Sequence, residues 1–282
     1  MGQDQYKKIA YQNGHLAHCH IFKPIVNHAK REGGIELKAK VGETTLSILL
    51  WRQLDIRDED LLLALLSLAR PQHTTEEIDA DDTEESAIEL WKKLEVSLVP
   101  EKSSIVIHTT KNELLTYMNK QAGKAAYSCL IDSIKRLQGT QILYENEHIK
   151  GGFNLLSWLE LDDGSLKVAI NPISAAVLIG DKKVSYVEHD LDERYDLPAG
   201  ICRRIHGIFN THSTKRGAGQ INLLVLARKV WSEEEISLKQ LRSLKGKCLQ
   251  LKKLKSWSVR IEGRGNKATV KWSKIPPQKS LK

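Results

Sequence analysis

The chain has 282 residues, of which 41% are hydrophobic, and a formal net charge of +8. This length and composition allow two globular domains and exclude a disordered or fibrous chain. No apolar run approaches the roughly 20 residues of a membrane-spanning helix, the four cysteines form no C-x-x-C pair and no secretory leader opens the chain, so a cytoplasmic protein with free thiols is expected.

The positive charge is concentrated at the C-terminal end. Residues 239–282 contain 14 Lys or Arg and a single acidic residue, Glu262, so the rest of the chain carries about −5. A one-sided charge of this kind attracts phosphate and makes binding depend on salt. Nucleic acid is therefore the expected partner, although an anionic membrane surface would be attracted in the same way.

The N-terminal third mixes weak and strong patterns. Residues 1–30 are polar, rich in histidine and without sustained periodicity, which predicts a loosely held N-terminal arm. Residues 35–51 alternate around Gly42-Glu43 as in a β-hairpin, and residues 58–69 form a leucine-rich helix with Asp58 as its N-cap. Residues 76–89 hold eight acidic residues and no basic one, which predicts an exposed acidic loop.

From residue 103 the predicted elements follow the order of a winged helix. They are a strand at 105–107, a helix at 111–119 capped by Thr110, a helix at 124–138, strands at 141–145 and 152–161, a strand at 166–170 and a helix at 172–179. The strands joined through residues 148–151 are interpreted as the wing. Residues 31–180, with the acidic loop, are therefore predicted to form a first winged-helix domain.

The same order of elements returns in the second half. It comprises a strand at 184–188, short helices at 190–195 and from Pro198, a strand at 220–221, a helix at 223–230, a helix at 237–254 and a hairpin at 257–272. Residues 181–275 are predicted to form a second winged-helix domain, followed by a basic tail at 276–282. The predicted fold class is thus α+β, with two tandem winged-helix domains.

The helix at 237–254 has two faces. Apolar residues at three- and four-residue steps form a stripe toward a core: Leu238, Leu241, Leu244, Cys248, Leu251 and Leu254. The opposite face is basic, and the hairpin that follows has one apolar and one mostly cationic face around the turn Arg264-Gly265-Asn266. A basic helix with an attached basic hairpin indicates a DNA-reading module.

The residues expected to contact DNA follow from these faces. Base edges are assigned to Lys239, Arg242 and Gln250, beside Ser243, and phosphates are assigned to Lys245, Lys253, Arg260, Arg264 and Lys267. The candidates in the first domain are Lys124, Tyr127, Ser128, Lys135, Arg136 and Lys150.

Catalytic motifs are missing from the sequence. There is no phosphate-binding loop of the G-x-x-x-x-G-K-[ST] type, so nucleotide hydrolysis is not expected. His15, His18, Cys19 and His20 offer soft metal ligands, but no second Cys/His pair completes a tetrahedral site. His18-Cys19-His20 also resembles the His-hydrophobic-His signature of rolling-circle nickases, without a strand pattern around it. No catalytic residue, metal or cofactor is predicted.

Several segments together resemble replication protein C (RepC) of IncQ-type broad-host-range plasmids. They are Gly152-Phe153-Asn154-Leu155-Leu156-Ser157, Val168-Ala169-Ile170-Asn171-Pro172, Val230-Trp231 and the basic helix that ends before Trp257. The resemblance covers roughly residues 100–272. It implies a bacterial initiator that binds direct repeats (iterons) at a plasmid origin and helps to open adjacent A+T-rich DNA, with a separate plasmid helicase and primase as partners.

Other functions remain open on the sequence alone. A transcriptional regulator would use the same winged helices, and a metal-dependent nickase would use the histidines near the N-terminus. Two different reading helices on one chain suit an initiator better than a symmetric regulator. Self-association as a homodimer is expected through residues 35–51.

Overall fold

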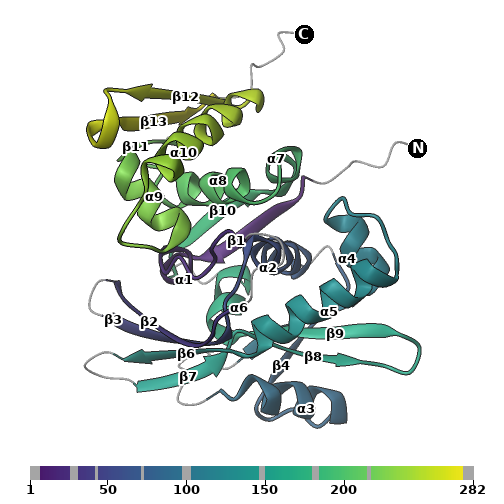
Figure 1. Ribbon diagram of the computed structural model, residues 1–282. Helices are drawn as coiled ribbons and strands as arrows, with labels where there is room; N and C mark the ends of the chain where they lie inside the picture. Colours follow the sequence, from purple (N-terminus) through teal and green to yellow (C-terminus); the bar gives the residue numbers. More distant parts are fainter. Residues whose placement is uncertain are drawn as a thin grey trace.

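The computed structural model describes residues 7–25, 31–41, 44–70, 73–96, 103–145, 150–179, 184–214 and 217–275. Two modules lie one above the other in Figure 1, each with its own sheet and helices. A short two-stranded sheet and a buried set of ion pairs join them. The predicted turn at 42–43, the loop around residues 148–149 and the basic tail at 276–282 lie outside the described residues.

The first module contains two four-stranded antiparallel sheets around one large core. One sheet has the order β2-β3-β6-β7, with strands Gly33–Val41, Thr44–Arg52, Thr140–Glu145 and Lys150–Asn154. The other has the order β4-β5-β9-β8, with strands Thr75–Asp79, Ser103–Thr110, Ser165–Ile170 and Leu156–Glu160. The helices are α2 (Ile56–Leu68), α3 (Glu85–Leu94), α4 (Lys111–Tyr117), α5 (Lys124–Gln138) and α6 (Pro172–Ile179).

The winged-helix order in this module runs α2, β5, α4, α5, β8, β9. The third strand, β9, pairs with both the first strand β5 and the second strand β8. Thr110 caps α4 by accepting a hydrogen bond from the Glu113 amide, as predicted. The apolar side of α5 buries Leu130, Ile134 and Leu137 in the core.

The predicted wing of this module is wrong. The strands β6 and β7 extend the sheet of the N-terminal hairpin, because β6 pairs with β3. Ile142, Tyr144 and Phe153 are buried there in the core rather than projecting into solvent. The chain leaves this sheet at the buried Leu155, and the hairpin in the position of a wing is β8–β9, whose turn has Asp162 and Asp163 exposed.

The second module has the compact order of a winged helix. Its elements are α8 (Ile201–Thr211), β11 (Ala218–Asn222), α9 (Leu223–Trp231), α10 (Leu238–Gln250), η1 (Leu251–Lys253), β12 (Trp257–Glu262), η2 (Gly265–Lys267) and β13 (Thr269–Lys274). The sheet order β11-β13-β12 repeats the pairing of β5, β9 and β8. Its separate core includes Trp257 and Trp272, which pack around Phe209. The prediction of two tandem winged-helix folds is confirmed.

The prediction of a loose arm at residues 1–30 is wrong for the part described. Strand β1 (Ile9–Asn13) pairs antiparallel with β10 (Tyr186–Asp190), 3.1 Å separates His189 Nε2 from Gln12 Oε1, and the helix α1 (Gly14–His18) follows. Leu16, Ile21 and Phe22 are buried in the core of the first module. The strand β1 could not be predicted from its neighbours in the sequence, because its partner β10 lies far along the chain.

The acidic segment at 76–89 is not a loop. Strand β4 pairs with β5, and α3 covers the outer face of that sheet with Ala87, Leu90 and Leu94 buried around Ile78. The acidic side chains occupy the solvent side of these elements, where charge is tolerated. Spacing of the few apolar residues, rather than composition, decides this structure.

Buried ion pairs fasten the two modules at the N-terminal end of α2. Glu59 accepts hydrogen bonds from Arg194 Nη2 (2.8 Å) and Arg204 Nη1 (2.9 Å), and Asp60 binds Arg194 Nε (2.8 Å) and Arg203 Nη1 (2.6 Å). Arg194 belongs to α7 (Leu191–Asp196), whereas the other two arginines lie on α8 of the second module. Burial alone would lower the pKa of Arg194, but Glu59 and Asp60 outweigh it and raise that pKa above its usual value. We call this contact the joint.

We expect Glu59→Ala to lower the free energy of unfolding by about 3–5 kcal/mol, since it leaves buried guanidinium groups without a carboxylate. Urea unfolding of the full chain measures this loss. Glu36→Ala is the matched control, because Glu36 pairs with Lys38 on the exposed surface of β2 and such pairs contribute about 1 kcal/mol or less. Equal losses in the two variants would show that ion pairs do not hold the joint.

Candidate nucleic-acid interface

Helix α10 presents a row of exposed basic side chains. Ser237 caps it in a capping box with Gln240, which satisfies amide groups at the start of the helix. Leu241, Leu244 and Cys248 are buried and anchor the helix to the core of the second module. On the outer side, the predicted residues Lys239, Arg242, Ser243, Lys245 and Lys253 are exposed. Leu238 was predicted in the buried stripe, but it is 66% exposed, because it is the first helical residue and extends past the core.

The hairpin β12–β13 forms the wing of this module. Trp257 and Val259 point into the core, so the intervening residues of β12 face outward. Gly263 and Gly265 adopt positive φ angles of 83° and 55° in the turn, a conformation that glycine adopts without steric cost. Arg264 and Lys267 are exposed beside them, as predicted. The wing therefore carries exposed cations at its turn, in addition to those of α10.

Glu262 neutralises part of this basic surface, a feature that the sequence interpretation missed. It accepts hydrogen bonds from Lys271 Nζ at 2.6 Å and lies 3.2 Å from Arg260 Nε. The hydrogen bond from Lys271, together with the charges of Lys271 and Arg260, lowers the pKa of the Glu262 carboxyl. Arg260 and Lys271 are directly opposite in the strand register, so the carboxylate also relieves repulsion between them.

Gln250 is less suited to base reading than predicted. Its side-chain oxygen accepts a hydrogen bond from the Cys202 thiol at 2.9 Å, and the residue is half-buried at the C-terminal end of α10. Bidentate recognition of adenine needs both the oxygen and the nitrogen of the amide. The structure therefore favours the N-terminal half of the helix, with Lys239, Arg242 and Ser243, as the part open to a groove.

Helix α5 in the first module offers fewer free groups. Lys124, Ser128 and Lys135 are exposed, whereas Tyr127 is half-buried against the core. Lys150 begins β7, and its side chain lies outside the described part of the structure. Unlike α10, α5 has an acidic residue, Asp132, on its exposed side.

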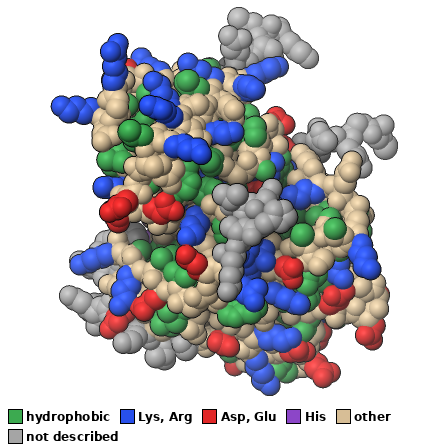
Figure 2. Space-filling model, in the orientation of Figure 1, with side chains coloured by type: hydrophobic (Ala, Val, Ile, Leu, Met, Phe, Trp, Pro, Cys, Tyr) green, Lys and Arg blue, Asp and Glu red, His purple; other side chains and the backbone are tan. Residues whose placement is uncertain are grey.

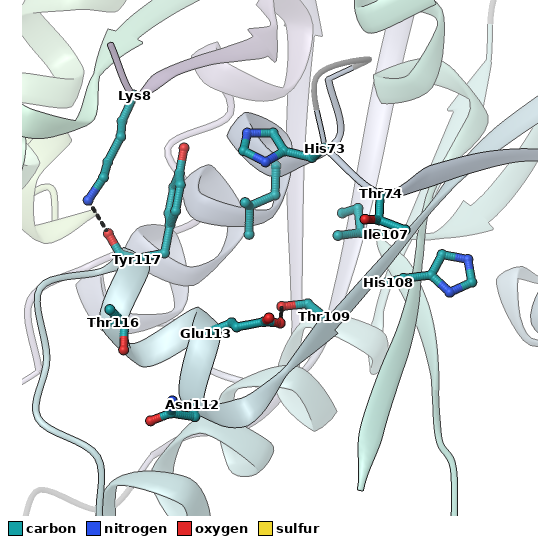
Figure 3. A pocket seen from close by; sticks show the side chains of 11 residues that line it. Lys8, His73, Thr74, Ile107, His108, Thr109, Asn112, Glu113, Thr116 and Tyr117 are labelled. Atoms are coloured by element: carbon teal, nitrogen blue, oxygen red, sulfur yellow. Dashed lines mark hydrogen bonds between the residues drawn. The ribbon is translucent and has the colours of Figure 1, made fainter. Parts of the chain in front are cut away.

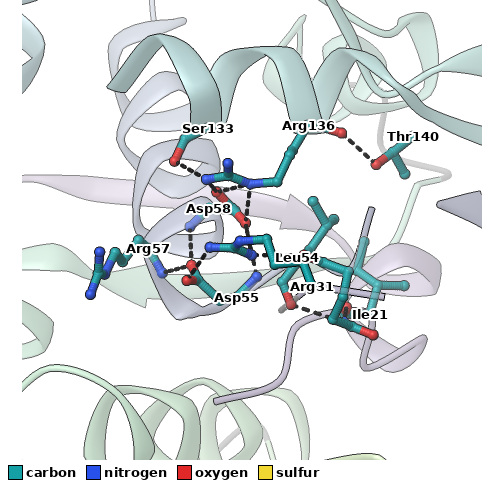
Figure 4. A network of polar contacts seen from close by, with 10 residues as sticks. Ile21, Arg31, Leu54, Asp55, Arg57, Asp58, Ser133, Arg136 and Thr140 are labelled. Carbon is teal, nitrogen blue, oxygen red and sulfur yellow. Dashed lines mark hydrogen bonds and ion pairs between the residues drawn. The ribbon is translucent and has the colours of Figure 1, made fainter. Parts of the chain in front are cut away.

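Arg136 is not a free DNA contact, which corrects the prediction. Figure 4 shows its guanidinium directed at Asp58 of α2, with Arg136 Nη2 and Asp58 Oδ1 2.7 Å apart. A further hydrogen bond of 2.9 Å goes to the Ser133 hydroxyl, and only 12% of the Arg136 side chain is exposed. Asp58 is the third residue of a capping box whose N-cap is Asp55, not the N-cap itself. Arg136 therefore anchors α5 to α2.

The basic groups gather unevenly on the surface. In Figure 2, Lys and Arg side chains dominate the upper part of the face, where α10 and the β12–β13 hairpin lie, and acidic and basic side chains are mixed below. The two wings differ in the same sense, because the β8–β9 turn has Asp162 and Asp163 where the β12–β13 turn has Arg264 and Lys267. The second module is thus the stronger attractor of phosphate.

The histidines near the N-terminus do not form the strand signature of a nickase. His18 is the last residue of α1, and the Cys19 thiol donates a hydrogen bond to the His15 carbonyl at 3.1 Å. Burial raises the pKa of that thiol to about 12, which disfavours the thiolate that a metal would need. Within the described residues, no group of three or more His, Cys, Asp or Glu side chains could hold a metal ion.

A cavity of about 490 Å³ lies between β5, α4 and the residues before β1. Figure 3 shows two hydrogen bonds in its lining: Lys8 Nζ donates to the Tyr117 carbonyl at 2.9 Å, and the Thr109 hydroxyl donates to Glu113 at 3.2 Å. His73 packs edge-on against the Tyr117 ring.

No helix in the described ranges is long and apolar enough to cross a membrane. A comparison with curated proteins finds no significant sequence match. Two solved structures of RctB share the fold. The crystal structure of RctB domains 2-3 (RctB-155-483) has a TM-score of 0.53 at 13% identity, covering 93% of this chain and 96% of that chain. The structure of a selenomethionine derivative of domains 2 and 3 of RctB has a TM-score of 0.56 at 13% identity, covering 93% and 98%.

The sequence also matches the family model of Replication protein C (RepC) over residues 5–270. That range includes the strand β1, the first module and the second module up to the start of β13, so the match extends well beyond one winged helix. The chain therefore belongs to the replication protein C family of plasmid replication proteins.

Proposed function

We propose that this protein is a plasmid replication initiator that binds direct repeats in duplex DNA at the plasmid origin. It places α5 and α10 in successive major grooves, about 34 Å apart on a duplex. The observation that carries this proposal is the repetition of one winged-helix order on a single chain, with a two-faced helix in the reading position each time. The ion pairs of the joint support it, since they fix one module against the other.

The two modules contribute unequally in this proposal. Lys239, Arg242 and Ser243 read base edges, because they lie in the half of α10 nearest its N-terminus. Phosphates are held by exposed cations of α10, the η1 turn and the wing: Lys245, Lys253, Arg260, Arg264 and Lys267. In the first module Lys124, Ser128 and Lys135 approach DNA, and the half-buried Tyr127 supports the helix from beneath.

Opening of the neighbouring A+T-rich DNA would use binding energy. Bending a site costs about 1–6 kcal/mol, and several copies on consecutive repeats together supply strain of that size. The plasmid helicase and primase then act on the opened strands and are the expected partners, and this chain acts without catalysis or a cofactor. A homodimer through the hairpin β2–β3 is proposed for the free protein, since β2 is an edge strand.

Footprinting on the parent plasmid tests the function. We expect a ladder of protected direct repeats beside an A+T-rich segment, and permanganate-reactive thymines in that segment at saturation without ATP. A single inverted repeat upstream of a gene would instead identify a transcriptional regulator. Protected repeats without reactive thymines would assign the opening step to other proteins.

Arg242→Ala is expected to weaken binding to the cognate repeat by about 1–3 kcal/mol and to have a smaller effect on random duplex, because it removes a base contact. Lys267→Ala is its counterpart in the wing and should weaken both duplexes alike, since it removes a phosphate contact. Fluorescence anisotropy with the two duplexes at one salt concentration measures both effects. Equal losses for Arg242→Ala on both duplexes would contradict its assignment to a base edge.

Glu262→Gln is expected to strengthen binding to any duplex several-fold, because it removes the carboxylate that competes with DNA phosphate for Arg260 and Lys271. The plot of log affinity against log salt should become steeper by about 1–2, as each new phosphate contact adds roughly 0.9 to the slope. Glu36→Gln makes the same charge change on β2, where Glu36 pairs with Lys38, and should leave the slope unaltered. An unchanged slope in Glu262→Gln would place the outer face of the β12–β13 sheet away from DNA.

A further inference from the structure

Cationic and imidazole side chains converge where α1, α8 and α9 meet, on the second module's side of the joint. We call His18, His20, Arg204, His212 and Lys229 the joint cluster. The His212 ring lies 5.4 Å from that of His18 and stacks on that of His20 at 5.7 Å. His18 is exposed, His20, His212 and Lys229 are half-buried, and Arg204 is buried behind them. The cluster is therefore open to solvent on one side.

His20 is placed between two cationic donors. Its Nδ1 lies 3.1 Å from Arg204 Nη2, and its Nε2 lies 3.0 Å from Lys229 Nζ. A neutral imidazole has one acceptor nitrogen, and arginine stays charged. Nδ1 therefore accepts a hydrogen bond from Arg204, and Nε2 carries the ring proton. The Lys229 ammonium then faces a second donor. His20 also has a φ angle of 51°, in the left-handed region that L residues seldom adopt.

One N–H donor of the Arg204 guanidinium has no hydrogen-bond partner among the described residues. Glu59 holds Nη1 and His20 faces Nη2, but the buried Nε has no hydrogen-bond partner among the described residues. Nε and Nη2 form one edge of the guanidinium, and arginine commonly binds a carboxylate or phosphate through such a pair of parallel hydrogen bonds. The free donor of Arg204 thus lies on the edge that faces the joint cluster.

The local charge is positive and uncompensated. In the joint, the three arginines 194, 203 and 204 share the two carboxylates of Glu59 and Asp60, which leaves one positive charge. The pKa values of His18, His20 and His212 are lowered, first by burial and then by the charges of Lys229 and of nearby Arg204 or imidazoles. The pKa of His20 falls to about 2. Burial and Arg204 also lower the pKa of Lys229. The cluster has more hydrogen-bond donors than acceptors and more cations than anions.

We propose that the joint cluster is a binding site for a phosphate group. A phosphate offers enough oxygen atoms to accept from Lys229, from Arg204 and from the surrounding imidazoles at once, whereas a carboxylate has two. Bound phosphate relieves the conflict at His20, because the Lys229 ammonium gains an acceptor. It also draws protons onto His18 and His212, whose rings pair with no carboxylate among the residues that the structure describes.

The phosphate has two sources: the backbone of duplex DNA, which rests on the proposed function, or a free phosphate compound, which does not. As a backbone contact, the site would hold DNA at the boundary between the two modules. As a site for a small molecule, it would bind its ligand beside the ion pairs that fix the modules to each other.

Titration of the full chain with inorganic phosphate, against sodium chloride at equal ionic strength, tests the site. We expect saturable shifts of the His18 and His212 imidazole signals in NMR spectra and a rise in the pKa of both rings. Lys229→Gln should weaken phosphate binding about tenfold, the loss expected for a charge-assisted hydrogen bond. Lys92→Gln removes an exposed lysine charge from α3 of the first module and should leave the shifts unchanged.

A duplex arm distinguishes the two sources, with DNA binding followed by anisotropy in the same samples. Shifts of His18 and His212 on addition of duplex identify the backbone as the source. Duplex that binds without these shifts, while inorganic phosphate causes them, identifies a free phosphate compound. If duplex does not bind but phosphate does, the site stands and the proposed function fails. If neither phosphate nor bound duplex differs from chloride, the phosphate site is overturned while DNA binding stands.

Discussion

Four neighbouring carboxylates begin α2, and they are buried against arginines that are themselves buried or partly buried. Asp55 and Asp58 hold Arg31 and Arg136 of the first module, and Glu59 and Asp60 hold the arginines of the joint. Acidic groups in the first turn of a helix are also favoured by its dipole. Because an uncompensated buried charge is costly, these pairs fix the positions of α5, α7 and α8 relative to a single helix. Because α10 packs against α8, the angle between α5 and α10 is also set from one turn of α2.

Local patterns were sufficient to predict much of each winged helix. Thr110 caps a helix that begins at the next residue, and within α5 and within α10 the buried apolar residues are three or four positions apart. Short-range spacing therefore identifies each of these features. The second module, whose strands β12 and β13 are adjacent in sequence, was predicted almost entirely. The sequence therefore predicts best those elements that pack against their immediate neighbours in the chain.

The wrong predictions share a physical cause, which is pairing between distant segments. Strand β1 needs β10, β4 needs β5 across a helix, and β6 pairs with β3 rather than forming a wing. The candidate site shows the same limit. Arg136 and Gln250 lie on the faces expected for DNA contacts, but Asp58 and Cys202 occupy them, and no local pattern shows such a partner. The exposure of lysines such as Lys239 and Lys245 was predictable because it depends on no partner from a distant segment.

The pairing of β1 with β10 also sets the order in which the chain can fold. Ile9 lies opposite Asp190, so the first strand remains unpaired until residues 186–190 have been synthesised. Closing a loop of that length costs conformational entropy and slows folding relative to local contacts. Leu191 and Tyr195, just beyond β10, also belong to the first core. On the ribosome, the first module therefore becomes complete only as the second begins to emerge.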